Sequence, residues 1–312
     1  MTKPPLHIQG MHGLGDCLHQ RAVLRQLMQR YVVTVETSWP SVYHDLIANG
    51  LKVTRRPVGL RTQAKNASRE SESDLFSPRH PSVRGGMRIF YGAGQIRQAQ
   101  SRTILEVMCD VTSTNYEQAD YRLPIPDDWT SRLFRKLGPL PTNWTKPWLV
   151  HRPLVARHEW KGSIARNSDA SAYNELYASI RDRFFVVSVA DLEEGREWIV
   201  GPPADADIIL HKGELVFEEL AALFKHADMV FTSSGFGAIL GPAVETPTVS
   251  IIGGYESIGC HDSGKKFAPY LAIGPINECG CFTSACTRAC DKTIDMSAAQ
   301  PALLDFVESI IP

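Results

Sequence analysis

Apolar and polar positions follow two alternating periods along the first part of the chain. Short apolar runs predict strands at Leu6–Gln9, Val32–Glu36 and Leu51–Thr54. Helical spacing of apolar residues predicts the intervening helices, Cys17–Tyr31 and Val42–Ala48. The resulting β-α-β-α-β order indicates one half of a doubly wound α/β fold with a parallel sheet.

The apolar pattern stops in the segment 55–102, which is basic and rich in Ser, Gly and Pro. Its cations are Arg55, Arg56, Arg61, Lys65, Arg69, Arg79, Arg84, Arg88, Arg97 and Arg102. Little in Leu60–Gly86 could pack, which predicts a long loop, followed by a strand at Arg88–Tyr91 and a helix at Gln98–Val111. The loop is either a solvated insertion or a basic surface for a polyanion such as a phosphorylated lipid, a glycan or nucleic acid.

A cluster of prolines between Leu123 and Trp148 predicts a linker with short ordered pieces and a domain boundary. These residues are Pro124, Pro126, Pro139, Pro141 and Pro147. The predicted domains are therefore 1–145 and 146–312, in agreement with a length beyond that of a usual single core.

The second half repeats the α/β pattern. Predicted strands are Trp148–His151, Phe184–Val189 and Asp207–Leu210, predicted helices are Ser171–Arg183, Val216–His226 and Ala298–Ile311, and a polar loop is expected between Arg152 and Asn167. The two halves together predict two Rossmann-like domains, each with a glycine turn at the carboxyl edge of its sheet.

The clearest unit of the second half is a strand, a glycine turn, a helix and another strand. It comprises Met229–Thr232, Ser233–Gly237, Ala238–Val244 and Thr248–Ile252. Unpaired N–H groups at the start of such a helix favour an anion, and the Ser233 hydroxyl and its neighbour add donors. The alternative is an ordinary strand-to-helix turn in which glycine allows close packing.

A second glycine turn, Gly10–Asp16, follows the first predicted strand. Its closing acid, Asp16, fits either a helix start stabilised by the dipole or a general base that takes a proton from a hydroxyl. Three glycines before the acid allow a close backbone approach, which favours the catalytic role. His12 and His19 are weaker candidates in the same segment.

Composition narrows the possible partners. A net charge of −1 gives no overall attraction to nucleic acid or membranes. The first residues lack the apolar core of a signal peptide, and no apolar run is long enough to span a bilayer. These features predict a cytoplasmic protein with reduced cysteines.

Four cysteines lie within twelve residues near the C-terminus: Cys279, Cys281, Cys286 and Cys290. Such density in a reducing compartment suggests a structural zinc site with four thiolate ligands. Free thiols or a disulfide in a C-terminal loop are the alternative, because the spacing lacks a standard C-x₂-C pair.

Two motifs resemble the heptosyltransferases of glycosyltransferase family 9. Gly13–His19 (GLGDCLH) is similar to their N-terminal GD-x-L-H motif, and Met229–Thr248 is similar to their donor motif, in which a strand enters Asp-Ser/Thr-Gly and a small-residue helix ends in Thr-Pro-Thr. His151 and Trp160 enclose a loop similar to the family's loop ending in Lys-x-Trp. The chain departs from the pattern at Ser233, which stands in place of the family's acid.

The resemblance implies an inverting GT-B enzyme whose two Rossmann-like domains face one another across a cleft. Domain 1–145 would bind the acceptor, with Asp16 as the base beside Gly13, Gly15 and His19. Domain 146–312 would bind a nucleotide-sugar. The implied donor ligands are Ser233, Ser234, Gly235, Gly237 and a cation from Arg157, His158 or Lys161.

The implied reaction is hexosyl or heptosyl transfer to an acceptor hydroxyl, without a cofactor, since no convincing Asp-x-Asp pair is present. Lipopolysaccharide core is the acceptor that the family implies, with nucleic acid or a protein as alternatives because of the basic loop. Other readings are a related epimerase and a protein that binds nucleotide-sugars or polyanions without catalysis. A Rossmann dehydrogenase is disfavoured, because Gly13-Leu14-Gly15 lacks the third glycine of G-x-G-x-x-G.

Overall fold

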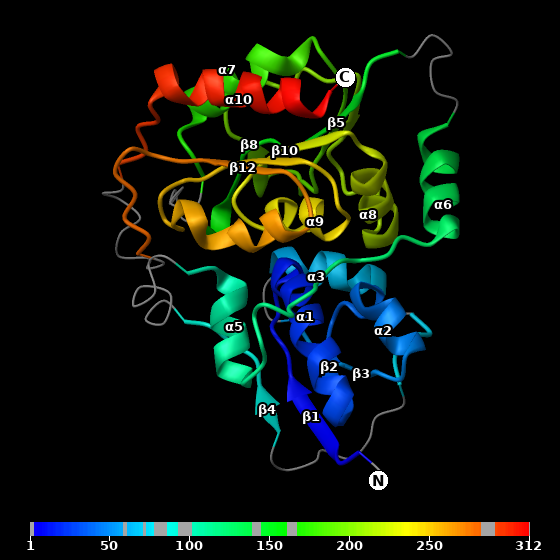
Figure 1. Ribbon diagram of the computed structural model, residues 1–312. Coiled ribbons are helices and arrows are strands. Elements are labelled where there is room, and N and C mark those ends of the chain that lie inside the picture. The colour runs from blue at the N-terminus through cyan, green and yellow to red at the C-terminus, as the bar shows by residue number, and fades with distance from the viewer. Residues whose placement is uncertain are drawn as a thin grey trace. The chain divides into compact units, whose positions relative to one another are not determined.

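The structure is a computed structural model that describes residues 3–58, 61–70, 73–77, 86–92, 102–138, 145–160, 167–281 and 291–311. The chain divides into two compact units and passes from the first to the second between Pro124 and Ile125. Each unit has its own parallel sheet (Figure 1), which confirms the predicted α/β class.

The first unit has a four-stranded parallel sheet in the order β3-β2-β1-β4. Its strands are β1 (Pro5–Gln9), β2 (Val32–Thr37), β3 (Lys52–Arg55) and β4 (Met87–Arg88). Its helices are α1 (Leu14–Arg30), η1 (Pro40–Tyr43), α2 (His44–Ala48), α3 (Arg61–Ala67), η2 (Ser68–Glu70) and α5 (Ile104–Thr112). The buried residues of β2 alternate along the strand, as expected where one face meets a helix.

The helix α1 is the buried centre of this unit. Leu18, Val23 and Leu27 are among its fully buried side chains, and the helix packs against α5. A capping box fixes the start of α5, because the Thr103 hydroxyl accepts from the N–H of Glu106 and the Glu106 carboxylate accepts from the N–H of Thr103.

The second unit has a six-stranded parallel sheet in the order β12-β11-β10-β5-β7-β9. Its strands are β5 (Trp148–His151), β7 (Phe185–Val189), β9 (Ile208–Leu210), β10 (Met229–Ser233), β11 (Thr248–Ile251) and β12 (Tyr270–Ile273). Its helices are α6 (Asp127–Leu137), η3 (His158–Trp160), α7 (Ala170–Arg181), α8 (Phe217–His226), α9 (Phe236–Ala243), η4 (Ile258–Lys266) and α10 (Met296–Ile310). Figure 1 shows α7 and α10 on one face of this sheet and α8 and α9 on the other.

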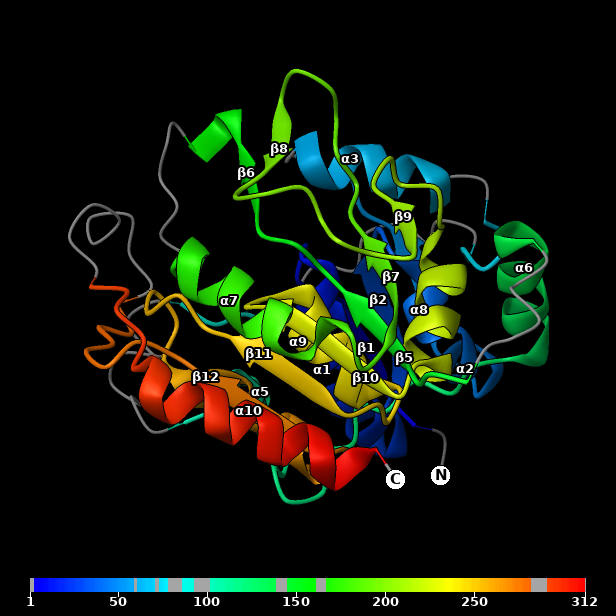
Figure 2. The ribbon, with the colours of Figure 1, turned by 90° about the horizontal axis from the view of Figure 1, so that it is seen from above.

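A short antiparallel pair lies apart from the main sheet of the second unit (Figure 2). It consists of β6 (Val155–Arg157) and β8 (Glu197–Ile199). The prediction of a loop between Arg152 and Asn167 is therefore wrong near its start, where the chain forms β6. A strand of three residues is too short to leave an alternating pattern in the sequence.

Three further predictions are wrong in part. The stretch predicted as a long loop contains α3, although none of the side chains of that helix is buried. The proline-rich segment predicted as a linker contains α6, whose Trp129 ring meets Phe217 of α8 at 6.1 Å. The strand predicted at Arg88–Tyr91 is confined to β4. In the first two cases tertiary contacts or local propensity outweigh a composition typical of loops.

None of the helices that the structure describes is long and apolar enough to cross a membrane.

Candidate functional site

The strand order of the second unit marks one point of its sheet as a ligand site. β5 is central, the chain builds outward to β7 and β9 on one side, and then returns to place β10 on the other side of β5. Ligands of open α/β sheets bind at such a reversal, at the carboxyl ends of the strands. The residues that leave these two ends are Arg152 after β5 and Ser234-Gly235 after β10.

Backbone geometry shapes the turn after β10. Gly235 has φ 114° and ψ −144°, in a region that side-chain-bearing residues rarely adopt, and α9 begins at the next residue. A Cβ on Gly237 would lie 2.6 Å from Thr232 Oγ1 and 3.0 Å from Arg152 Cδ. The Ser234 hydroxyl oxygen is buried and has no hydrogen-bond partner among the described residues.

Arg152 is fixed at its backbone and unpaired at its tip. Its N–H donates to the Phe231 carbonyl at 2.9 Å, and its carbonyl accepts from the Tyr173 hydroxyl at 2.6 Å. Its guanidinium carbon lies 5.3 Å from the centre of the Phe236 ring. The Nη1 atom is buried and, within the described part of the chain, has no hydrogen-bond partner. Burial, followed by the nearby charge of Arg157, lowers the pKa of Arg152 to about 10, so the group remains a cation at neutral pH.

The cations predicted from the following loop lie in different surroundings. Arg157 is on β6, with its Nε 3.0 Å from the carboxylate of Glu197, whose side chain is fully buried. His158 is exposed and its ring meets Trp198 at 5.5 Å. Lys161 lies outside the described residues, so its predicted role stays a prediction.

His151, at the end of β5, lies in the core. Its ring stacks on Tyr177 with centroids 4.0 Å apart, and its Nδ1 is 3.1 Å from the Ser188 hydroxyl, which also meets His211 Nε2 at 2.8 Å. Burial lowers the pKa of His151 to about 3, with a smaller contribution from His211. This imidazole is therefore neutral and structural.

In the first unit, hydrogen bonds hold the loop between β1 and α1 along its length. The Met11 N–H donates to Gln20 Oε1 at 2.8 Å, the His12 carbonyl accepts from Trp39 Nε1 at 2.9 Å, and the Gly10 carbonyl accepts from Arg56. This loop is therefore fixed before any ligand binds.

Asp16 lies in the first turn of α1 and is held in place. The Tyr91 hydroxyl donates to its Oδ1 at 2.7 Å. A Cβ on Gly13 would lie 2.4 Å from its Oδ2, so glycine at this position gives the carboxylate its room. Gly15 is inside the same helix, and a carboxylate in a first turn is stabilised in its ionised form by the helix dipole.

The two histidines near Asp16 differ in their surroundings. Burial, then the charges of Arg56 and Arg88, lower the pKa of His12, which shows that this loop lies in a basic environment. His19 is fully buried and its ring meets the edge of Tyr121 at 5.0 Å. In this structure His19 has no exposed surface with which to touch an acceptor.

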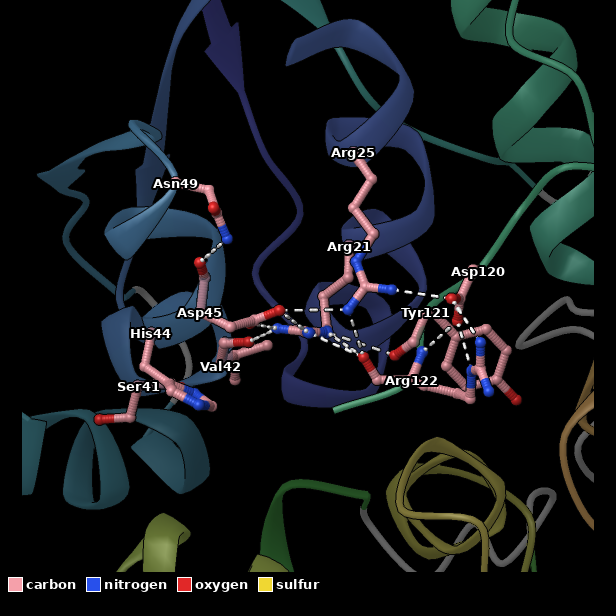
Figure 3. Close-up of polar contacts among 10 residues, drawn as sticks. All are labelled: Arg21, Arg25, Ser41, Val42, His44, Asp45, Asn49, Asp120, Tyr121 and Arg122. Carbon is pink, nitrogen blue, oxygen red and sulfur yellow. Dashed lines mark hydrogen bonds and ion pairs between the residues drawn. The ribbon is translucent and has the colours of Figure 1, made fainter. Parts of the chain in front are cut away.

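Arg21, five residues after Asp16 on α1, ties this helix to the segments that carry Val42, Asp45 and Tyr121 (Figure 3). This guanidinium is fully buried and donates to the carbonyls of Tyr121, Arg122 and Val42. It also pairs with the Asp45 carboxylate at 2.8 Å. The charges of Arg21 and then Arg25 keep the pKa of Asp45 below its usual value despite burial.

Part of the basic segment surrounds a cavity of about 190 Å³ in the first unit. Arg55 and Arg56, at the end of β3, line it together with Phe76, and the Arg55 guanidinium carbon lies 4.6 Å from the centre of the Phe76 ring. The basic segment is thus partly folded at the carboxyl edge of the first sheet.

The cysteine cluster is described only in part. The Cys279 thiol donates to the Gly254 carbonyl at 3.2 Å and Cys281 is largely buried, whereas Cys286 and Cys290 lie outside the described residues. Next to this segment, ligand atoms of buried Glu256, Cys260 and His261 lie within 4.8 Å of one another. The Gly254 carbonyl accepts from the N–H of Gly280 at 3.0 Å, which joins the two segments.

The sequence patterns did not indicate two residues of these sites, Arg152 and Tyr91. Arg152 could have been found as the first residue after a central strand, followed by a proline that fixes the turn. No local signal connects Tyr91 with Asp16, because the two are 75 positions apart.

The fold of this chain is also found in proteins of known structure. Neither a protein-family profile nor a curated protein sequence matches the chain. Among solved structures, the iron-containing dodecameric glycosyltransferase TibC of enterotoxigenic E. coli aligns with a TM-score of 0.61 and 13% identity, over 100% of this chain and 78% of TibC.

Two further structures from E. coli also align over nearly their whole length. The ADP-heptose lps heptosyltransferase II gives a TM-score of 0.56 at 11% identity, with 98% of both chains covered. The heptosyltransferase WaaC with ADP gives 0.51 at 13% identity, over 98% of this chain and 99% of WaaC. The resemblance drawn from the sequence motifs is thereby confirmed at the level of the fold: this chain has the two-unit GT-B fold of the heptosyltransferases.

Proposed function

We propose that the protein is an inverting glycosyltransferase that moves a hexosyl or heptosyl group from a nucleotide-sugar to an acceptor hydroxyl. The observation that carries the proposal is the site at the reversal of the second sheet. There a glycine turn, the start of α9 and a half-buried Arg152, whose buried Nη1 has no hydrogen-bond partner among the described residues, lie together. Such a combination of helix N-terminus and cation is suited to a diphosphate.

The donor half of the reaction belongs to the second unit. Ser233, Ser234, Gly235 and Gly237 offer hydroxyl and N–H donors to the diphosphate, with a cation to balance the charge that develops as the nucleoside diphosphate leaves. Two of the solved heptosyltransferase and glycosyltransferase structures hold ADP or ADP-D-beta-D-heptose, which supports a nucleotide-sugar as the donor class.

The acceptor half belongs to the first unit. Asp16 takes the proton of the acceptor hydroxyl as that oxygen bonds to the anomeric carbon of the sugar. The bond from the same carbon to the diphosphate oxygen breaks on the opposite face, so the configuration inverts and the nucleoside diphosphate leaves. Tyr91 holds the Asp16 carboxylate, and Arg56 and Arg88 near His12 suit a glycan or another acceptor that carries negative charge.

A metal has a structural place in this proposal, not a catalytic one. Cys279, Cys281, Cys286 and Cys290 are proposed to hold zinc, and the Glu256–Cys260–His261 cluster lies beside their segment. Since one solved structure of this fold is described as iron-containing, elemental analysis of the purified protein should cover iron as well as zinc. A stoichiometry near zero for both metals contradicts this assignment.

The first experiment is thermal stabilisation by a panel of nucleoside diphosphates and nucleotide-sugars, since a ligand of the folded state raises its midpoint. A shift with one nucleotide supports the donor site and names the donor for acceptor screening by product analysis. Binding without turnover on any glycan acceptor favours instead a non-catalytic binding protein, which the Ser233 departure also allows. No shift with any nucleotide contradicts the donor site.

A further inference from the structure

We propose that Arg152, and not a cation of the loop that follows it, holds the donor diphosphate. This inference rests on the proposed function and names the residue that gives the donor site its charge. Four features of the second unit carry it: the missing counter-ion of Arg152, its fixed position, the glycine that makes room for it, and the occupation of Arg157.

The first feature is the half-buried positive charge of Arg152, which no ion pair within the described part of the chain neutralises. Among the described residues Arg152 forms no ion pair, and its Nη1 has no acceptor. The charges of Tyr173 and Asp191 favour the cationic form of Arg152, but their effect on its pKa is smaller than the opposing effects of burial and of Arg157. A charged group with a buried nitrogen and no acceptor is costly to the folded state, and a bound anion would remove that cost.

The second feature is the rigidity of the position. Hydrogen bonds to β10 and to Tyr173 of α7 fix the N–H and the carbonyl of Arg152. The following residue, Pro153, also restricts the backbone angles of Arg152. The backbone of Arg152 is therefore already fixed before a ligand binds, so no backbone ordering is required on binding.

The third feature is the path of the side chain across the start of α9. Cδ of Arg152 passes so close to Gly237 that a methyl group there would approach it to 3.0 Å, and the guanidinium then lies beside Phe236. The first N–H groups of α9 and the buried Ser234 hydroxyl belong to the same turn. The Arg152 guanidinium, which follows β5, and the Ser234 hydroxyl, which follows β10, thus both lie at the N-terminus of α9.

The fourth feature is the state of the competing cation. Arg157 is 3.0 Å from Glu197, whose carboxylate is fully buried. If Arg157 moved to a phosphate, it would leave that carboxylate buried and unpaired, which is unfavourable. Arg157 instead adds positive potential near Arg152: after burial, its charge is the next cause that lowers the pKa of Arg152.

The test compares Arg152→Met and Arg152→Lys with wild type. The matched control is Arg183→Met, an exposed arginine of the same unit that lies just before the amino end of β7. The probes are ADP, UDP, GDP and CDP and the corresponding nucleosides, with affinity measured by calorimetry and the thermal midpoint measured with and without each probe.

For the nucleoside diphosphate that wild type binds, Arg152→Met should weaken binding about 10- to 100-fold, as expected for loss of hydrogen bonds to a charged group. Nucleoside binding should not change, since it involves no phosphate. Without ligand, the midpoint of Arg152→Met should stay level or rise, because the substitution removes a half-buried charge whose Nη1 has no acceptor. Arg152→Lys should weaken diphosphate binding several-fold, since lysine keeps the charge but cannot form the two parallel hydrogen bonds of a guanidinium. Arg183→Met should bind the diphosphate as tightly as wild type.

The outcomes separate this inference from the function beneath it. If wild type binds none of the four diphosphates, the donor site itself is wrong. If wild type binds one and either folded Arg152 variant binds it equally well, the inference is overturned and a loop cation takes its place. An equal loss of nucleoside and diphosphate affinity also overturns it, since Arg152 would then act on the shape of the site.

Discussion

Two arginines, one in each unit, bring a positive charge into the protein and differ in how that charge is satisfied: Arg21 is fully buried, whereas Arg152 is half-buried with its Nη1 atom enclosed. Arg21 donates to three backbone carbonyls and pairs with Asp45, so its charge is satisfied (Figure 3). Arg152 sits at the end of β5 with a buried nitrogen that, among the described residues, no acceptor meets. Arg21 therefore stabilises the fold of its unit, whereas Arg152 has a hydrogen-bond donor that a ligand could use.

The same contrast separates the two glycine turns. Side chains of Gln20, Trp39 and Arg56 bind the turn after β1, and Tyr91 holds its acid. In the turn after β10 the Ser234 hydroxyl is left buried without a described partner. A general base must be in position before its substrate arrives, whereas an anion site needs open donors. One local motif can therefore serve either purpose, and tertiary contacts decide which.

The largest effect is expected from Asp16→Asn. The substitution keeps the size of the side chain and can still accept from Tyr91, but it removes the base. Transfer should fall about 10²- to 10⁴-fold, with nucleoside diphosphate affinity unchanged because that site lies in the second unit. Steady-state rates and calorimetry on the same preparation measure both quantities, and a variant with wild-type turnover contradicts the role of Asp16.

The next largest effect should be on stability, from Asp45→Ala. It leaves the guanidinium of Arg21 buried without its carboxylate and should lower the free energy of unfolding by about 3 kcal/mol, the low end for breaking a buried ion pair. Urea denaturation measures the loss. Asp45→Asn keeps a hydrogen-bond acceptor and serves as the milder control. A loss below about 1 kcal/mol, within the range of exposed ion pairs, would show that the backbone carbonyls alone satisfy Arg21.

A smaller effect is expected from Tyr91→Phe, which removes one hydrogen bond to the proposed base. The rate should fall about 3- to 10-fold, the range of one net hydrogen bond. The acid side of the kcat/KM profile should move to higher pH, because the lost bond favours the ionised carboxylate. Tyr31→Phe, at the amino end of β2, is the control. A lower rate with an unmoved pH profile would instead point to a role in acceptor binding.

The smallest effect concerns pH and His151. Its pKa is lowered to about 3 in the folded state, so below pH 6.5 the unfolded chain binds a proton that the folded chain does not. Stability therefore rises with pH between about 3 and 6.5, and His151 should account for about 0.7 kcal/mol between pH 6 and pH 7. His151→Gln should flatten the dependence by that share, as measured by urea denaturation at both values. The slope should not vanish, since burial also lowers the pKa of His211 and His226.

Much of the fold could be predicted from the sequence because its main signals are local. Apolar periodicity located β1, α1, β10 and α9 within a few residues, and glycine turns marked two carboxyl edges. The predictions failed at α3 and α6. No side chain of α3 is buried, so its sequence lacks the apolar face by which a helix is recognised. In α6 only Trp129 and Leu133 are buried, a pair that stands out only once α8 is seen to cover it.

The sequence by itself determined the α/β class, the positions of both glycine turns and the candidates Asp16 and Ser233–Gly237, since these depend on residue types at short spacing. Only the tertiary structure decided which charges are satisfied. It paired Arg157 with Glu197, buried His19 against Tyr121, brought Tyr91 to Asp16 and left Arg152 open at the sheet reversal. The physical reason is that the availability of a charge depends on neighbours distant in the chain, and only folding brings those neighbours together.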